Sequence, residues 1–254
     1  MINVIINADD FGMSEAFNYG VIKGYRDGVV SSTTLMVNMD AAEHAVSLAK
    51  AFPDLFIGQH TNLVLGKPCS NPKDIPSLVD ENGYFWSSSY YRNGSKNFVY
   101  EDVKKETISQ MERFKELLGY YPQHIEGHSV FGEVVEKAFK DVALEYNIHA
   151  SLFSENSHGY KETIGPSDFK TMMNIMSKGL SVENILNDDL NILDCDGKIV
   201  ELHFHPGYLD QFILDNSTLT TPRCKDLETL CHAKVINWFS EHSINRISFG
   251  ELRQ

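Results

Sequence analysis

The sequence predicts an α/β fold in which about seven parallel strands form a closed or nearly closed barrel. Short runs rich in β-branched and apolar residues alternate with longer stretches of helical periodicity along the whole chain of 254 residues. Strands separated by helices of this length indicate βαβ units and a mainly parallel sheet. Because no repeat, linker or low-complexity segment interrupts the alternation, a single domain over residues 1–254 is expected.

Seven strands and six helices follow from this alternation. The expected strands are residues 2–7, 31–37, 55–60, 123–127, 148–153, 198–204 and 244–249. The expected helices are residues 14–27, 40–51, 101–118, 132–146, 181–192 and 225–242. Helix starts are marked by Ser14, by Glu101 and Asp102 in a first turn, and by Ser181 with Glu183 close behind it.

Two long irregular stretches, residues 61–100 and 206–222, interrupt the pattern. Loops of this length are usually functional or disordered, and in a parallel α/β barrel the site lies where loops leave the carboxyl ends of the strands. The aromatic group in the first stretch has three interpretations: it stacks on sugar rings, it forms a lid that packs on the protein's own body, or it forms a self-association surface. The third interpretation would be compatible with a homodimer. This group is Tyr84, Phe85, Trp86, Tyr90 and Tyr91.

Composition and hydropathy argue against nucleic-acid-binding, disulfide-rich, secreted and membrane proteins. A formal net charge of -13 argues against a nucleic-acid partner, because phosphate binding depends on Lys and Arg. The four cysteines form no CxxC pair, so neither a disulfide framework nor a cysteine zinc site is expected. The N-terminus lacks the basic and long apolar regions of a signal peptide, and no run approaches the ~20 apolar residues of a membrane span. A cytoplasmic protein that does not bind membranes is expected.

Polar side chains close four of the expected strands. If these strands are parallel, the side chains gather at one end of the sheet although they lie far apart in the sequence. Two imidazoles and a carboxylate suit a borderline divalent metal with open positions, and the remaining carboxylate and histidine are available for acid–base chemistry. The residues in question are Asp9, Asp10, His60, Glu126, His128 and His205.

Each of these residues also has a structural interpretation. An Asp-Asp pair after a strand is commonly a turn or helix cap, a histidine at a strand end is often only hydrogen-bonded, and His-Pro-Gly often forms a turn. The shared position at strand ends is what favours a site. We expect His203 to lie outside it, facing away from His205. Glu201 is a candidate to orient an imidazole, with a structural salt bridge as the alternative.

Six collinear motifs carry a resemblance to a known family. The chain resembles the YdjC/ChbG-like carbohydrate deacetylases, and within them the chitooligosaccharide (diacetylchitobiose) deacetylases, through the GKP segment and the Pro222-Arg223 pair. Each motif is weak alone, whereas the ordered set spans nearly the whole chain. The motifs are NADDFG at 7–12, GYRDGVVSSTT at 24–34, GQHTNLVLGKP at 58–68, HIEGH at 124–128, ELHFHPGY at 201–208 and PR at 222–223.

The resemblance implies a distorted (β/α) barrel of the NodB-like deacetylase type and the hydrolysis of an N-acetyl group from a small amino sugar. It also implies that Asp10, His60 and His128 bind one divalent metal ion, that Asp9 is the catalytic base, and that His205 is the general acid. Two histidines and one carboxylate suit Zn²⁺, whereas Mg²⁺, which prefers oxygen ligands, is commonly associated with this family. Both metals stay open.

One segment departs from the family pattern. The family usually has an Asp-Ser/Gly-His segment followed by further histidines, whereas this chain has EGHSVFG at 126–132. His128 is retained, so the expected metal ligands are complete, but Glu126 replaces the aspartate and Ser129 to Gly132 replace the later residues. A longer glutamate can still orient a neighbouring imidazole from a different distance. The surroundings of the metal and the choice of substrate are therefore open.

Two further residues are candidates for substrate contact. Arg223 is expected either to pair with Asp9 or to contact a sugar hydroxyl, and Trp86 to stack on a sugar. Two rival functions are kept: a metal-independent glycoside hydrolase, which uses a carboxylate pair ~5–9.5 Å apart, and an inactive sugar-binding homologue, to which the EGHSVFG segment points.

Overall fold

A single parallel sheet organises the chain. The computed structural model describes residues 1–152, 163–164 and 169–252. The strands lie in the order β5-β4-β3-β2-β1-β7-β6, all parallel, and β8 pairs with the start of β1. Their bounds are β1 Asn3–Phe11, β2 Ser32–Leu35, β3 Phe56–Asn62, β4 His124–His128, β5 His149–Ala150, β6 Thr163–Ile164, β7 Ile199–Phe204 and β8 Asn245–Arg246.

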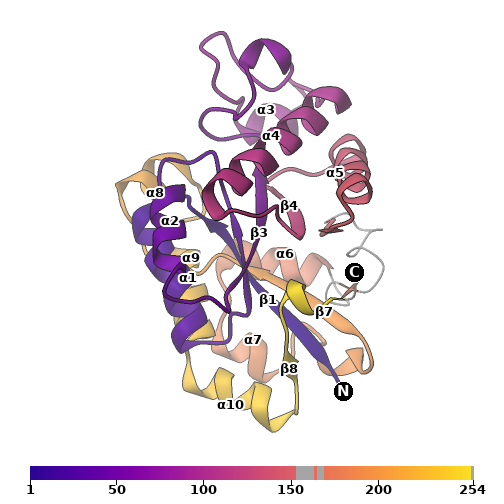
Figure 1. The fold of residues 1–254 in the computed structure, drawn as a ribbon. Helices are drawn as coiled ribbons and strands as arrows, with labels where there is room; N and C mark the ends of the chain where they lie inside the picture. The colour runs from indigo at the N-terminus through magenta and orange to yellow at the C-terminus, as the bar shows by residue number, and fades with distance from the viewer. Residues whose placement is uncertain (153–162, 165–168, 253–254) are drawn as a thin grey trace.

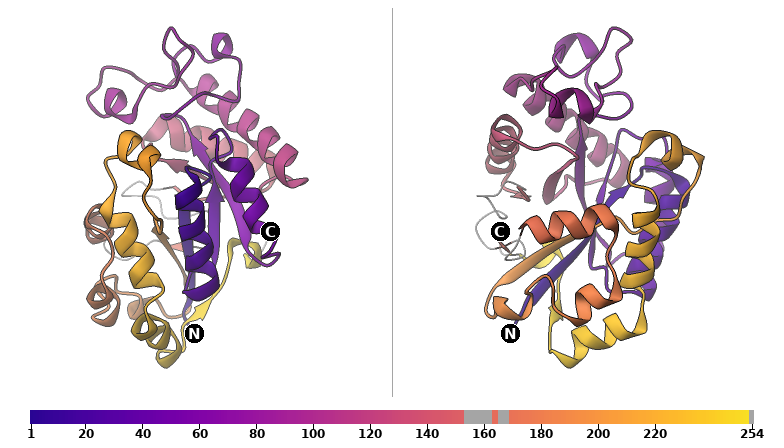
Figure 2. Two further views of the ribbon diagram at one scale, coloured as in Figure 1. Left: turned by 90° about the vertical axis from the view of Figure 1, so that its left-hand side faces the viewer. Right: turned by 180° about the vertical axis from the view of Figure 1, so that it is seen from behind.

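Helices cover the outer face of the sheet. Helices α1, α2 and α9 lie together on one side, and α4 and α5 pack against each other beside β3 and β4 (Figure 1). The segment that carries α3 stands at one end of the molecule, beside α4 (Figure 2). The bounds are α1 Glu15–Asp27, α2 Ala42–Ala49, α3 Ser88–Arg92, α4 Tyr100–Leu118, α5 Glu133–Tyr146, α6 Phe169–Lys178, α7 Val182–Leu186, α8 Gln211–Asn216, α9 Thr221–Leu230 and α10 Ala233–Glu241, with short 3-10 turns at Pro72–Asp74, Leu193–Cys195 and Phe249–Glu251.

The two faces of β1 show how the core is divided. Alternate side chains of a strand point to opposite faces, and Val4 and Ile6 belong to the large apolar core under the helices. Ile5, on the other face, packs with Ile247 and Phe249 from the C-terminal segment. Farther along this inner face the side chains become polar and stay buried. The inner face is therefore apolar at the amino ends of the strands and polar toward their carboxyl ends, where the site lies.

The expected α/β class and parallel sheet are confirmed, with changes at several boundaries. β1 continues to Phe11, through both aspartates, and the expected helix 225–242 is divided into α9 and α10 because His232 caps a new helix start. The expected helix 181–192 is only α7, and 244–249 contains only the short β8. Helices α3, α6 and α8 and strand β6 were not expected.

Closure of the barrel stays a prediction. Within the described part of the chain, no ladder joins the edge strands β5 and β6. Residue 153, at the end of an expected strand, lies outside the described residues.

Candidate metal centre and active site

A local irregularity of β1 brings two neighbouring aspartates to one cavity. In a regular strand Asp9 and Asp10 would point to opposite faces. Here the β1–β2 ladder shifts register between Ala8 and Phe11, and Asp10 adopts a φ of 65°. Aspartate tolerates this left-handed conformation better than most residues, and bulges often re-aim side chains at functional sites. Both carboxylates consequently line the same cavity.

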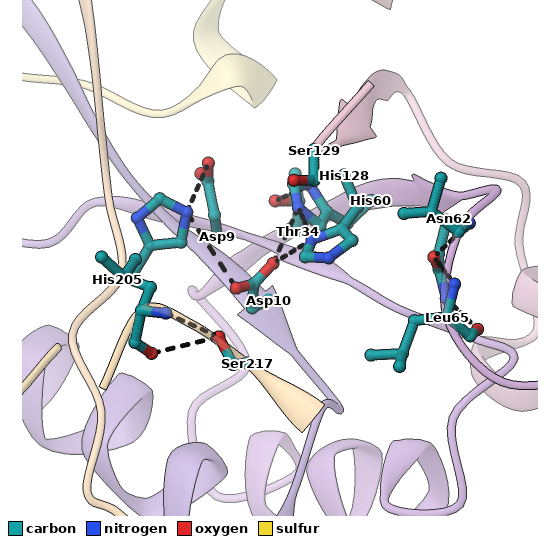
Figure 3. Close-up of polar contacts among 12 residues, drawn as sticks. Asp9, Asp10, Thr34, His60, Asn62, Leu65, His128, Ser129, His205 and Ser217 are labelled. Atoms are coloured by element: carbon teal, nitrogen blue, oxygen red, sulfur yellow. Dashed lines mark hydrogen bonds and ion pairs between the residues drawn. The ribbon is translucent and has the colours of Figure 1, made fainter. Parts of the chain in front are cut away.

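Three groups from β1, β3 and β4 converge at this end of the sheet. The Oδ1 atom of Asp10 lies 2.9 Å from Nε2 of His60 and 2.7 Å from Nδ1 of His128. The two ring nitrogens are 3.3 Å apart. Asp10 lies between these rings and His205 (Figure 3). The three ligands expected from the sequence are thus brought together in one cluster.

The second oxygen of Asp10 is held by Arg223. Nη1 of Arg223 donates to Oδ2 of Asp10 at 2.8 Å, and the remaining guanidinium nitrogens donate to the carbonyl of Leu219 and the hydroxyl of Ser217. Burial raises the pKa of Asp10, but His128 and Arg223 outweigh it and hold the pKa well below its usual range. Asp10 is therefore an ionised carboxylate with one oxygen, Oδ1, directed at the histidines.

Glu126 fixes the orientation of His60. The two residues are paired across the β3–β4 ladder, and Oε1 of Glu126 lies 2.8 Å from Nδ1 of His60. Thr34 also donates to this oxygen. Burial lowers the pKa of His60, but the hydrogen bonds with Asp10 and Glu126 outweigh it and raise the pKa to about 10. Nε2 of His60 is thereby left to face Asp10 and His128.

This donor set fits a divalent metal ion. Two imidazole nitrogens and one carboxylate oxygen meet at a point next to a cavity, the arrangement of a three-ligand site with positions left for water and substrate. The opposite nitrogen of His60 bonds a carboxylate, as is usual for a metal-ligating histidine. His60 lies between the carboxylates of Asp10 and Glu126, which favour a positive charge there and so raise its pKa. A cation bound at this point would supply that positive charge.

A buried histidine that the sequence placed outside the site lies directly behind it. Nδ1 of His203 is 3.2 Å from Oδ1 of Asp9 and 3.0 Å from Oε2 of Glu126, and Nε2 is 3.2 Å from Oε2 of Glu201. The expectation for His203 was wrong because residues two apart on a strand share a face, so Glu201, His203 and the start of the His205 segment point the same way. The expectation that Glu201 orients an imidazole agrees with this contact.

His203 carries positive charge among these carboxylates. Burial lowers the pKa of its ring, but Glu126 and Asp9 outweigh it and raise the pKa well above its ordinary value. A buried carboxylate is costly unless it is paired, and the imidazolium provides that pairing. His203 therefore supports Asp9 and Glu126 from inside the sheet.

Asp9 and His205 both line the cavity. Oδ1 of Asp9 accepts from Asn7 at 2.7 Å and from His203, which leaves Oδ2 toward His205. Oδ2 lies 3.9 Å from Nε2 of His205, too far for a hydrogen bond between them. The backbone of His205 is held by Asp226, whose Oδ2 accepts its N–H at 2.9 Å. Oδ2 of Asp9 and Nε2 of His205 are not hydrogen-bonded to each other. Each is therefore available to exchange a proton with a bound molecule.

The cavity above these residues has a volume of about 480 Å³, within the range typical of small-molecule sites. Both long stretches noted in the sequence contribute to its wall, as expected from their place at the strand ends. Helix α6, which the sequence did not predict, supplies a third part. The wall residues from these segments are Val64, Leu65, Ser87–Ser89 and Arg92, then Met173, Met176 and Ser177, then Asn216–Leu219.

Comparison with known proteins identifies the family of this chain. The model of the family described as YdjC-like protein matches residues 3–241. The chain belongs to the YdjC-like family. Members of similar sequence include a carbohydrate deacetylase from Clostridium beijerinckii, 36% identical over 99% of this chain and 100% of that one. A chitooligosaccharide deacetylase from Salmonella newport is 30% identical over 98% of each chain.

Solved structures place this YdjC-like chain in a wider fold group. A crystal structure from Enterococcus faecalis, of a protein provisionally named for cellobiose-phosphate cleavage, has a TM-score of 0.87, 27% identity and coverage of 100% of this chain and 99% of that one. A peptidoglycan N-acetylglucosamine deacetylase matches at a TM-score of 0.51 and 17% identity, over 97% of this chain and 85% of that one. This second similarity supports the expected NodB-type fold.

Two residues expected to touch substrate, Arg223 and Trp86, differ in their relation to the cavity of this YdjC-like chain. Arg223 pairs with Asp10 and not with Asp9, which gives it a positioning role. It also lines the cavity, so its contact with a sugar hydroxyl stays a prediction. Trp86 is absent from the residues that line the cavity; its ring packs against Tyr90 and under Lys96. Contact of Trp86 with a substrate stays a prediction.

Part of the aromatic group of the first long loop packs that loop together, whereas Tyr84 and Tyr90 are exposed. Phe85 is buried in an apolar cluster, and Tyr91 stacks on Phe98 at a centroid distance of 3.9 Å. The contacts of Phe85 and Tyr91 agree with the second of the three interpretations, and the other two stay predictions. No described helix is both long and apolar enough to cross a lipid bilayer.

Sequence reasoning missed Asn7, His203 and Asp226 as supports of the site. The spacing of Glu201, His203 and His205 contained a usable signal, because residues at intervals of two along a strand share one face. Asp226 offered none: it lies in α9 and reaches His205 only through the packing of that helix.

Proposed function

We propose that this protein is a metal-dependent carbohydrate N-deacetylase, which releases acetate from an N-acetylated amino sugar of the chitobiose or chitooligosaccharide type. Relatives along its whole length are named carbohydrate deacetylases. The observation that carries the proposal is the convergence of Asp10, His60 and His128 on one point, beside Oδ2 of Asp9 and the ring of His205.

An acetamide resists hydrolysis because its carbonyl is a weak electrophile and its amine a poor leaving group. A divalent ion held by Asp10, His60 and His128 would polarise the carbonyl and lower the pKa of water. The remaining chemistry falls to the chain's own residues. Oδ2 of Asp9 faces the cavity and takes a proton from the attacking water, while Asn7 and His203 hold the other oxygen still.

The departing amine needs a proton, and His205 is placed to give it. Its ring borders the cavity, and its backbone is anchored by Asp226. General acid and base groups typically contribute about 10²–10⁴-fold each. Arg223 and Glu126 take no part in the proton transfers; they hold Asp10 and His60 in the orientation that the ligand cluster requires.

Acetate release tests this proposal. The protein is stripped with EDTA, reloaded separately with Zn²⁺ and Mg²⁺, and assayed on N-acetylglucosamine and N,N′-diacetylchitobiose by enzymatic determination of acetate. We expect no acetate from the stripped protein and recovery on reloading, and the better metal identifies the cofactor. Cleavage of the glycosidic bond without acetate, insensitive to EDTA, would instead establish a glycoside hydrolase. Sugar binding with no product under either metal would establish an inactive homologue.

A further inference from the structure

The turn of residues 10–13, at the end of β1, holds two residues in the left-handed conformation. Asp10 has a φ of 65° and Gly12 a φ of 94°, and the carbonyl of Asp10 accepts the N–H of Met13 at 3.0 Å, which closes the turn. A residue other than glycine rarely adopts a positive φ, and it keeps that conformation only where its surroundings fix it. Because the backbone angles of Asp10 decide where its carboxylate points, whatever fixes this turn also places Asp10 beside His60 and His128.

Asn18, on α1, holds this turn by a side-chain hydrogen bond. Its Oδ1 accepts the N–H of Gly12 at 2.6 Å, and both residues are buried. A buried N–H without a partner is costly, so this contact stabilises the turn against any conformation in which Gly12 has moved. Asparagine is a poor helix former because its side chain competes for backbone groups. Its place inside α1 is therefore explained by this contact and not by helix propensity.

Asn18 is itself anchored on α2, which packs beside α1 (Figure 1). Since Oδ1 is the atom that faces Gly12, Nδ2 is the donor end of the amide. Nδ2 donates to the carbonyl of Ala41 at 3.0 Å and to Nδ1 of His44 at 3.1 Å. The ring of His44 in turn lies edge-on to Tyr19, with 5.1 Å between the ring centroids. Both hydrogens of the amide are thus used, which fixes the orientation of the Asn18 side chain.

We propose that Asn18 is the positioning residue of the metal ligand Asp10, with His44 as its anchor on α2. The inference rests on the proposed metal-dependent function, which it deepens: the geometry of the ligand cluster is set by the helices that cover the sheet as well as by the strands. Among the described residues, the wall of the cavity includes neither Asn18 nor His44. Both therefore act through the backbone of residues 10–13 and take no part in the chemistry.

Metal affinity in the absence of substrate tests the positioning role. The stripped wild type, Asn18→Ala and Asn18→Asp are titrated with Zn²⁺ by calorimetry, and their unfolding is followed in urea. We expect Asn18→Ala to bind Zn²⁺ about 10–100-fold more weakly, the range for a group that orients a ligand. Asn18→Asp keeps an acceptor for the Gly12 N–H and should recover most of the affinity. Ser14→Ala is the matched control. It removes the N-cap of the same helix, whose Oγ accepts from the N–H of Phe17, so it should lower the stability and leave the Zn²⁺ affinity unchanged.

Wild-type affinity in Asn18→Ala, no recovery in Asn18→Asp, or an equal loss of affinity in Ser14→Ala overturns the positioning role. If Asn18→Ala does not fold, His44→Phe decides. This variant keeps a ring against Tyr19 but removes the acceptor of Nδ2, so the Zn²⁺ affinity should fall about 3–10-fold, and an unchanged affinity overturns the role.

If the wild type binds neither Zn²⁺ nor Mg²⁺, the proposed function fails, and the turn itself decides the positioning role separately. The crystal structure of metal-free Asn18→Ala, or of His44→Phe where the first variant does not fold, should show the φ of Asp10 outside the left-handed region. An unchanged turn overturns the positioning role whatever the metal result.

Discussion

Oε1 of Glu126 lies 2.8 Å from Nδ1 of His60, across a strand pair in which the two residues are direct neighbours. Burial raises the pKa of this glutamate, but His203 and His60 outweigh it and hold the pKa well below its ordinary value. An ionised carboxylate thus fixes which ring nitrogen of His60 is presented to Asp10. The Glu126 that departs from the family pattern therefore still orients an imidazole.

Glu126→Gln should weaken metal binding and leave the fold intact. The amide keeps the size of the side chain but loses the charge that orients His60, and loss of such a partner typically costs 10–100-fold in metal affinity. Calorimetric titration of the stripped protein with Zn²⁺ measures the effect. Glu145→Gln, at an exposed position of α5, serves as the control. Unchanged affinity in Glu126→Gln would show that His60 needs no carboxylate partner.

Asp9→Asn and His205→Ala should fold, bind metal and lose most turnover. Each removes one proton-transferring group while Asp10, His60 and His128 remain, so a fall in kcat of about 10²–10⁴-fold is expected for each. Acetate release gives the rate, and metal analysis of the purified variants shows that the ligand cluster is intact. Near-normal kcat in either variant would remove that residue from its role.

Asp226 should make the stability of the protein depend on pH. Burial raises its pKa to about 6, against hydrogen bonds from the N–H groups of Leu180 and His205 that lower it. Since the same carboxyl has its ordinary pKa of 3.8 in the unfolded chain, the native state binds the proton more tightly between these values. The free energy of unfolding therefore falls as pH rises through this window, by up to about 3 kcal/mol.

Asp226→Asn removes the titrating carboxyl, so comparing the stability of the variant with that of the wild type isolates the contribution of Asp226. The amide cannot accept from both N–H groups, which subtracts a constant amount of stability at every pH. The free energy of unfolding of the variant minus that of the wild type should therefore rise by up to about 3 kcal/mol from about pH 4 to about pH 7. Urea denaturation of the metal-free proteins measures it, with the exposed Asp54→Asn as control. A pH-independent difference would contradict the raised pKa.

Gly20→Ala should displace the segment that carries His205. A Cβ at position 20 would lie 2.5 Å from the Cα of Gly207, in backbone that follows His205 directly. Overpacking of this kind costs about 1–3 kcal/mol, and the displaced segment should lower kcat. Gly24→Ala, on the same helix, is the matched control: its Cβ would meet a Val30 side-chain atom at 3.0 Å, which can move. Equal stability and activity in both variants would show that α1 does not set the position of the segment.

The convergence of five polar side chains at one end of the sheet was predictable from the sequence, while their chemical roles stay predictions. Asp9, Asp10, His60, His128 and His205 were all recognised because each follows a run with strand character, and parallel strands bring their carboxyl ends to one edge of a sheet. The order of the longer elements was also readable, since periodicity is a local property, whereas the short α3, α8 and β6 and the helix α6 were missed. Boundaries were less so: the break between α9 and α10 depends on a cap at His232, in an otherwise continuous helical pattern.

Tertiary structure alone decided which atom of each residue faces which partner. The register shift in β1 turns Asp9 and Asp10 to one cavity, Arg223 selects Asp10 over Asp9, and Asp226 reaches His205 across a helix contact. These relationships join residues up to 213 positions apart. The sequence determined the chemical groups and the strand ends that carry them, because both follow from local pattern. The pairing of these groups depends on burial, because a charged side chain removed from water is costly unless it has a partner. Which partner is in reach is decided only when the helices and strands pack together.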